Sequence, residues 1–194
     1  MANQTAGLIC AHHHLYSTLA RGMPATAKTP TNFLEILQQV WWRLDAALDD
    51  EMIYWSAMLG ATESLMNGTT CIIDHHESPN CIEGSLSTIE RACKTVGVRV
   101  NACYGVTDRW DDSGNLHSKV SPISKMTQAA KRGLAECDRY LSEGGRGMVG
   151  AHAAFTCSDE TLSAASDLAV KHKTGVHIHV AEGLDDSHAG ARLE

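Results

Sequence analysis

Two histidines near the start of the chain, His12 and His14, have the spacing that most directly indicates chemistry. They follow an apolar run at residues 7–11 that predicts a short β-strand. Side chains two positions apart leave an extended backbone on the same face, with their bases roughly 7 Å apart, whereas His13 points to the opposite face. Two imidazoles placed in this way can converge on one metal ion. Taken alone, however, such a pair is more often a polar strand end than a metal site.

A second pattern lies near the other end of the chain. His179 closes a predicted strand at residues 175–180, and Glu182 follows three positions later. His12, His14 and His179 together would supply three imidazoles to a metal and leave a position open for water, as in catalytic zinc sites. A divalent metal there would make hydroxide available, and Glu182 would carry protons from the water to the leaving group. The alternative for Glu182 is a solvated carboxylate in a loop.

Three further residues are candidates for substrate contact because each follows a predicted strand. His152 ends the fourth strand, where position gives equal weight to substrate contact and to a structural polar role. His76 belongs to a polar run, residues 74–77, from which one side chain is expected to reach the pocket. Arg109 could bind an anionic or planar substrate, although an exposed loop is the simpler expectation. His177 shares the face of His179 but lies deeper, which favours a hydrogen-bonded core histidine.

The elements that must position these residues alternate regularly along the chain. Apolar runs at residues 7–11, 69–74, 98–104, 148–151 and 175–180 predict strands. Helical patterns lie between them: residues 33–44 behind a cap at Thr31, residues 50–67, residues 84–96, a helix from Ser121-Pro122 to residue 141, and a helix from Ser158. Strands that alternate with helices predict a parallel sheet with right-handed crossovers.

The placement of the histidines favours a barrel over an open nucleotide-binding sheet. The first strand runs into His12 without a G-x-G-x-x-G or Walker loop. In TIM-type barrels, functional residues lie at the C-terminal ends of the strands, and here histidines recur at these ends. We therefore predict a single α/β domain over residues 1–194, a partial TIM-type (βα) barrel with about five of eight units. A flavodoxin-like binding domain without metal is the outside alternative.

Composition narrows the classes of partner. The chain has 194 residues, with 16 Lys and Arg against 23 Asp and Glu, so its net charge of −7 argues against a nucleic-acid partner. It has no apolar run long enough to span a membrane. Seven cysteines, without a C-x-x-C pair, are typical of free thiols in a reducing compartment, which indicates a cytoplasmic location.

These motifs together resemble the amidohydrolase superfamily. The run GLICAHHHL at residues 7–15 is similar to the "PGL-x-x-x-H-x-H" start of its barrels, with Ala6 in place of the usual proline. Residues 150–158 and 177–182 resemble the fourth- and fifth-strand motifs of the branch that contains cytosine deaminases, chlorohydrolases and S-adenosylhomocysteine deaminases, and within it the aminohydrolases associated with selenium metabolism. The resemblance, which covers residues 7–186, implies that His12, His14 and His179 bind Zn²⁺ or Fe²⁺, that Glu182 handles protons, and that His152 approaches the substrate.

The chain also departs from the family pattern. Members of this branch are much longer, begin with a small β-sandwich, and continue with a histidine on strand six and an aspartate on strand eight. These parts are expected to be absent here, so the resemblance implies a barrel truncated at both ends. Five strands cannot close a barrel of eight, and the unpaired edges predict a homo-oligomer.

The function that follows is a metal-dependent hydrolase acting on a small molecule. The resemblance implies hydrolytic deamination or a related C–N bond hydrolysis by a metal-activated water. Esters and phosphoesters would be further substrates because a metal hydroxide attacks many electrophiles. The alternative is an inactive fragment that acts as a metal-binding or self-assembling module.

Overall fold

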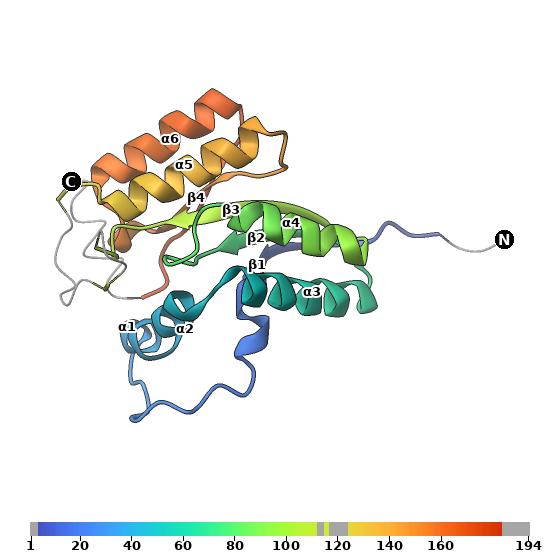
Figure 1. Ribbon diagram of the computed structural model, residues 1–194, viewed down its shortest axis with the longest axis horizontal. Helices are drawn as coiled ribbons and strands as arrows, with labels where there is room; N and C mark the ends of the chain where they lie inside the picture. The colour runs from blue at the N-terminus through green and yellow to red at the C-terminus, as the bar shows by residue number, and fades with distance from the viewer. Residues whose placement is uncertain (1–3, 112–114, 117–123, 184–194) are drawn as a thin grey trace.

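A sheet of five parallel strands, in the order β1-β2-β3-β4-β5, forms the centre of the computed structural model (Figure 1). The structure describes residues 4–111, 115–116 and 124–183. The strands are β1 (Leu8–His13), β2 (Thr69–His76), β3 (Arg99–Val106), β4 (Val149–Ala153) and β5 (Val176–His179). All four pairings are parallel, each between strands consecutive in sequence. The predicted strands and their parallel order are therefore confirmed.

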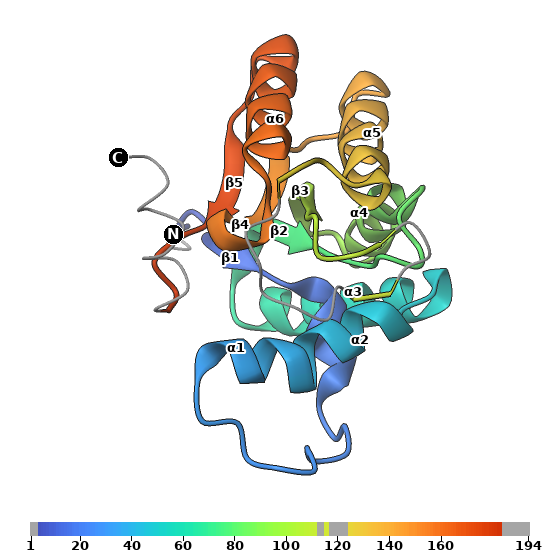
Figure 2. The same cartoon turned by 90° about the vertical axis from the view of Figure 1, so that its left-hand side faces the viewer.

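The helices connect the strands, and the four longest of them lie along one face of the sheet (Figure 2). They are η1 (Leu15–Ala20), α1 (Phe33–Ile36), η2 (Leu37–Trp41), α2 (Trp42–Ala47), α3 (Asp50–Met66), α4 (Ser85–Val96), α5 (Gln128–Ser142), η3 (Ala154–Thr156) and α6 (Asp159–His172). The segment η2 has π-helical hydrogen bonding and separates α1 from α2, so the predicted helix over residues 33–44 is not regular.

Several helix ends follow directly from local chemistry. The Asp49 side chain caps α3 by accepting a hydrogen bond from Met52 N at 2.8 Å, and Gly68 after the helix adopts a φ of +82°. Ser158 caps α6 by accepting from Thr161 N. Gly97 ends α4 with a φ of +94°, a conformation that side chains with a Cβ rarely adopt. These ends agree with the predicted ones.

Two predicted helix starts differ from the structure. Asn32, rather than Thr31, caps the first helix: its side chain accepts from Glu35 N at 2.9 Å, while the Thr31 hydroxyl donates to the Glu35 carboxylate. The fourth helix was expected to begin at Ser121-Pro122, which lies outside the described residues. It begins instead at Gln128 behind the cap Thr127, because the buried Asp108 carboxylate accepts from both the amide and the hydroxyl of Thr127.

Alternate residues of the strands serve opposite faces. Ile72 on β2 and Ala102 and Tyr104 on β3 face the helices and belong to the main core, together with residues of α3, α4 and α5. The other face, the inner face, carries His12 of β1, His75 of β2, and His177 and His179 of β5, whose neighbouring ring centroids lie 4.4–5.0 Å apart. The outer face of the sheet thus serves packing, and the inner face carries the groups capable of polar chemistry.

The sheet curls strongly across its five strands. At about 4.8 Å between neighbours, the two edge strands of a flat five-stranded sheet would be roughly 19 Å apart. Yet His12 Nδ1 on β1 lies 2.9 Å from His177 Nε2 on β5. This contact between the two edges is the geometry of a half-barrel, as the partial TIM-type fold predicts.

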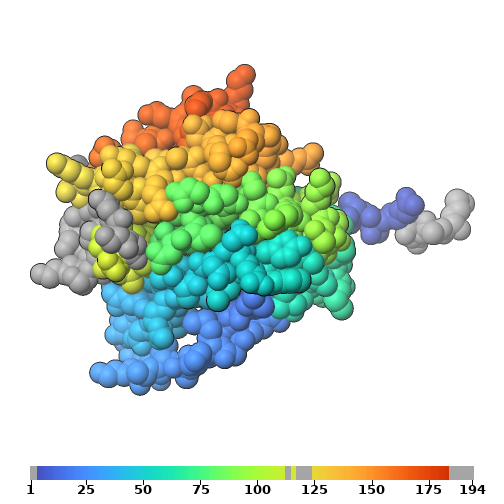
Figure 3. All heavy atoms as spheres, viewed as in Figure 1, coloured from blue at the N-terminus to red at the C-terminus, as the bar shows by residue number. Residues whose placement is uncertain are grey.

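The edges of the sheet stay open to solvent. Figure 3 shows the first described residues extending away from the packed body of the molecule. Leu8 and Ile9 on β1 are 62% and 65% exposed, and Val180 after β5 is 61% exposed. None of the helices in the described part of the chain is long and apolar enough to cross a membrane.

Candidate active site

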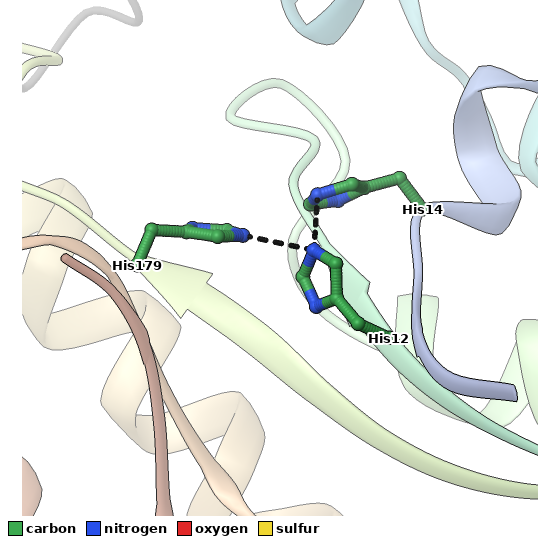
Figure 4. A group of neighbouring side chains, drawn as sticks. All are labelled: His12, His14 and His179. Atoms are coloured by element: carbon green, nitrogen blue, oxygen red, sulfur yellow. Dashed lines mark hydrogen bonds between the residues drawn. The ribbon is translucent and has the colours of Figure 1, made fainter. Parts of the chain in front are cut away.

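The structure brings His12, His14 and His179 together at the C-terminal ends of the strands (Figure 4). Nε2 of His12 lies 3.1 Å from Nε2 of His14 and 3.3 Å from Nε2 of His179. The three donor nitrogens all lie within 4.8 Å of one another. His12 and His14 come from the end of β1, and His179 comes from the end of β5, at the opposite edge of the sheet.

The separations of these nitrogens fit one metal ion. Ligands bound tetrahedrally to Zn²⁺ at 2.0–2.1 Å lie about 3.3–3.4 Å from each other, close to the 3.1 and 3.3 Å found here. His14 and His179 are half-buried, whereas His12 is exposed. A cation held by the three imidazoles would therefore keep an open side, which is typical of catalytic sites rather than closed structural ones.

Backbone carbonyls orient two of the three rings. Nδ1 of His14 donates to the carbonyl of His75 at 2.7 Å, and Nδ1 of His179 donates to the carbonyl of His152. A neutral imidazole that donates from Nδ1 has its lone pair on Nε2, so both lone pairs face the cluster. Such outer partners are typical of metal-binding histidines, because they set the tautomer and the ring orientation.

The surroundings favour the neutral form of His12 and His14. Burial, together with the nearby rings of His179 and His12, lowers the pKa of His14 to about 4. Burial and the adjacent His179 also lower the pKa of His12. Because only the neutral imidazole offers a lone pair to a metal, these two histidines can bind a cation at neutral pH without first losing protons.

A cavity of about 140 Å³ opens beside the cluster. It is lined by His14, Tyr16, Phe33, Leu37, Trp41, Asp45, His152, His179 and Glu182. The apolar and aromatic part of this lining comes from α1 and η2, and the polar part consists of imidazoles, the Tyr16 ring and two carboxyl groups. Glu182 itself is exposed and lies in the loop after β5. The cavity therefore joins the three clustered histidines to Glu182 and His152.

His152 lines the cavity, and one hydrogen bond holds its ring. Its Nδ1 lies 2.9 Å from the hydroxyl of Thr156, and its Nε2 lies 3.4 Å from the Glu77 carboxylate. Burial lowers the pKa of His152 to about 3, so the ring is neutral at physiological pH. Its Nε2, which makes no hydrogen bond within the described residues, can therefore bond to a substrate without bringing a charge into the cavity.

Asp45 is a site residue that the sequence analysis missed. Its side chain lines the cavity, is almost wholly buried, and shares a hydrogen bond with the hydroxyl of Tyr16. Burial and the neighbouring Glu77 carboxylate raise the pKa of Asp45 well above its usual range. The available signal was an acid within the apolar helical pattern of α2, at a position where an exposed residue is not expected.

Two residues predicted to contact substrate lie elsewhere. His76 is buried between the rings of Tyr16 and Tyr104, and its Nε2 lies 2.8 Å from the hydroxyl of Ser78. It is not among the described residues that line the cavity. From the same run, His75 instead lies beneath the cluster, with its ring centroid 4.4 Å from that of His179.

Arg109 is buried, so the expectation of an exposed loop at this position is wrong. Its guanidinium donates to the carbonyl of Phe155 at 2.9 Å and lies over the rings of Trp42 and Phe155. The following Trp110 is buried as well, and its indole N–H donates to the Glu77 carboxylate at 2.9 Å. Aromatic faces and a carbonyl compensate for the lost hydration of the guanidinium. A single sequence does not reveal these partners, because they come from distant segments.

Comparison with known proteins places this geometry in a family. The model of the amidohydrolase family matches residues 4–192. A 5'-deoxyadenosine deaminase from Methanocaldococcus jannaschii is 30% identical over 187 residues, which cover 93% of this chain and 38% of that protein. A 5-methylthioadenosine/S-adenosylhomocysteine deaminase from Desulforamulus reducens is 28% identical over 180 residues, which cover 93% of this chain and 37% of that protein. The chain thus spans less than half the length of the curated relatives it matches.

Solved structures show the same fold. A triazine hydrolase from Arthrobacter aurescens superposes with a TM-score of 0.75 at 20% identity, covering 97% of this chain and 43% of the other. An adenosine deaminase from Xanthomonas campestris with bound zinc has a TM-score of 0.67 at 22% identity, covering 97% of this chain and 41% of the other. With its family model, its fold and its strand-end histidines in agreement, the chain belongs to the amidohydrolase family.

Proposed function

We propose that this chain carries the metal-binding and proton-transfer part of a hydrolase that deaminates a small aminated heterocycle. The observation that carries the proposal is the convergence of three Nε2 atoms, from His12, His14 and His179, beside a cavity that also holds Glu182 and His152. The named deaminases among the relatives support the C–N class of reaction. A divalent metal held by these nitrogens would lower the pKa of water toward neutrality and so supply a hydroxide nucleophile.

In this proposal Glu182 moves the protons. Its carboxylate lines the cavity next to His179 and is reached by solvent from the loop after β5. A carboxylate in this position accepts a proton from water and returns it to the departing amine, a role that needs hydrogen-bond reach to both. His152, neutral and held through Nδ1 by Thr156, would use Nε2 to hydrogen-bond the substrate and so orient it.

The remaining walls indicate what the substrate offers. Phe33 and Trp41 line the cavity with aromatic rings, against which a planar heterocycle could stack. Asp45, with Tyr16 beside it, offers a buried carboxyl group that can bond to hydroxyl or amino hydrogens on the substrate. A planar base with a hydroxylated or aminated substituent satisfies both walls, which is the class of compound that the named relatives deaminate.

Zinc is the metal that we propose for the site. Three imidazole nitrogens in a half-open arrangement suit Zn²⁺, although imidazole also suits Fe²⁺. The zinc bound in the adenosine deaminase from Xanthomonas campestris supports the assignment.

The test combines metal content with activity. Protein purified without chelator is analysed for zinc, and ammonia release is followed with an adenosine-type nucleoside and with a triazine. We expect zinc in the parent protein, its loss in His14→Ala and His179→Ala, and retention in His172→Ala, whose histidine bonds Asp138 on the outer surface. Glu182→Gln is expected to keep zinc and lose ammonia release. A parent protein without zinc, or zinc retained by both ligand variants, would overturn the proposal.

We also propose self-association and a cytoplasmic location. Leu8, Ile9 and Val180 leave apolar surface at the two open edges of the sheet, which pairing with a second copy would cover. All seven cysteines are free thiols, which supports a reducing compartment.

A further inference from the structure

His12 differs from the other two clustered histidines in how its ring is oriented. Backbone carbonyls hold His14 and His179, but the partner of His12 is a side chain: its Nδ1 lies 2.9 Å from Nε2 of His177. The two rings meet edge to face, with centroids 5.0 Å apart and planes inclined by 72°. His177 comes from β5 and His12 from β1, so this contact also joins the two edges of the curled sheet.

His177 has a partner of its own in Cys103 on β3. Nδ1 of His177 lies 3.5 Å from Sγ of Cys103, and this thiol donates to the carbonyl of Asp74 at 3.5 Å. The thiol is completely buried. Gly150 on the neighbouring β4 leaves room for it, because a Cβ at that position would lie 3.1 Å from Sγ and only 2.1 Å from the Tyr104 carbonyl oxygen.

If the lone pair of His12 Nε2 faces the cluster, one arrangement of hydrogens satisfies the contacts among His12, His177 and Cys103. A neutral imidazole carries a single N–H, so His12 must then donate from Nδ1 to Nε2 of His177. His177 accepts there and therefore has its own hydrogen on Nδ1, toward Cys103. The thiol accepts that hydrogen bond and donates its S–H to the carbonyl of Asp74. Each donor in this sequence meets one acceptor, with no hydrogen left over.

We propose that His177 is a positioning residue for the metal site and that Cys103 sets its tautomer. His177 holds the His12 ring so that Nε2 points toward His14 and His179, and Cys103 keeps the hydrogen of His177 off the nitrogen that must accept. This inference rests on the proposed function, since it takes His12 as a metal ligand. His177 is not among the described residues that line the cavity, so it acts through His12 and not on the substrate.

Zinc affinity is the property that this arrangement controls, and it can be measured without turnover. Zinc is titrated against a chromophoric chelator in the parent protein and in His177→Phe, His177→Gln and His172→Gln. Loss of an outer hydrogen-bond partner of a ligand typically weakens metal affinity about 10–100-fold, and we expect this for His177→Phe. His177→Gln should recover most of the affinity, because its amide oxygen accepts from His12 and its amide nitrogen donates to Cys103. His172→Gln, which changes an equally half-buried histidine outside the site, should match the parent.

A second pair of variants tests the thiol. Cys103→Ala, which removes the acceptor, should weaken zinc affinity several-fold, and Cys103→Ser should weaken it less. Cys137→Ala is the matched control, because that thiol is equally buried but faces the helix side of the sheet. In the zinc-loaded parent, nitrogen-15 spectra of the imidazoles should place the hydrogen on Nδ1 of both His12 and His177.

The outcomes separate this inference from the proposed function. Parent-like zinc affinity in both His177→Phe and Cys103→Ala would overturn the inference and leave the proposed function intact. Equal loss in His177→Phe and His177→Gln would assign His177 a packing role and would also overturn it. If His177→Phe does not fold, a hydrogen found on Nε2 of His177 in the zinc-loaded parent would overturn the inference in its place. A parent protein that binds no zinc would overturn both.

Discussion

Replacing Asp74 by asparagine tests whether burial of an ionisable carboxyl group makes the stability of the fold depend on pH. Asp74 is fully buried at the end of β2, and its Oδ1 accepts a hydrogen bond from the amide of Leu15 at 2.7 Å. Asparagine keeps this acceptor but cannot ionise. Asp74→Asn should therefore preserve the path of the chain after His14 and change only how stability depends on pH.

The size of the effect follows from the pKa. Burial raises the pKa of Asp74 from 3.8 to about 7, although the Leu15 amide favours the charged form. At about 1.4 kcal/mol per pKa unit, the difference corresponds to roughly 4 kcal/mol, of which roughly 3 kcal/mol falls between pH 4.5 and pH 8. A carboxyl whose folded pKa is raised favours folding below pH 3.8, and this contribution is lost as the pH rises toward 7. The parent should thus lose stability relative to Asp74→Asn as the pH rises.

Urea unfolding followed by tryptophan fluorescence, in chelator at pH 4.5 and pH 8, measures the free energy of unfolding of both proteins. The free energy of unfolding of the parent, minus that of the variant, should be lower at pH 8 than at pH 4.5 by about 3 kcal/mol. Asp138→Asn is the control, because Lys171 and His172 lower the pKa of that surface carboxyl and its contribution is complete above pH 4.5. A difference between parent and Asp74→Asn that is the same at both pH values would refute the reasoning.

Three other predictions concern packing and assembly. In Gly105→Ala the new Cβ would lie 2.4 Å from Cε1 of His75, so we expect a loss of about 1–3 kcal/mol in urea unfolding, and parent-like stability would contradict that contact. Arg109→Met leaves the Phe155 carbonyl without its guanidinium donor and should cost about 1–3 kcal/mol; a raised KM with unchanged stability would instead restore Arg109 as a substrate contact. Light scattering after size-exclusion chromatography should give a mass of at least two chains, and a compact monomer would rule out self-association through the open edges.

Local sequence patterns were sufficient for the strands and for most helix ends. A cap such as Ser158 or a stop such as Gly97 acts within a few residues, so neighbouring positions contain all the information needed. The start of α5 could not be found in this way. Its cap Thr127 is held by Asp108, and Asp108 also accepts from the amide of Ser158, 50 positions away.

The same limit applies to the cavity. Asp45 lies in a helical segment whose pattern indicates packing, and only the fold shows that its carboxyl reaches the cavity beside His152. His75 and His76 are adjacent in sequence and alternate between the two faces of β2, so their order says that one faces inward but not which. Arg109 follows a strand as functional residues do, yet the aromatic rings around it come from remote segments.

For the histidine cluster, the sequence by itself determined that His12 and His14 leave one face of a strand and that His179 stands at the end of another. Period-two alternation and the common direction of parallel strands require no more than local information. Only the tertiary structure decided that these nitrogens meet, since β1 and β5 are opposite edges of the sheet. Each of the four strand pairings adds to the curvature of the sheet, until the side chains of His12 and His177 on its two edges lie 2.9 Å apart. Because this curvature is the sum of four pairings, no single segment of the sequence contains it.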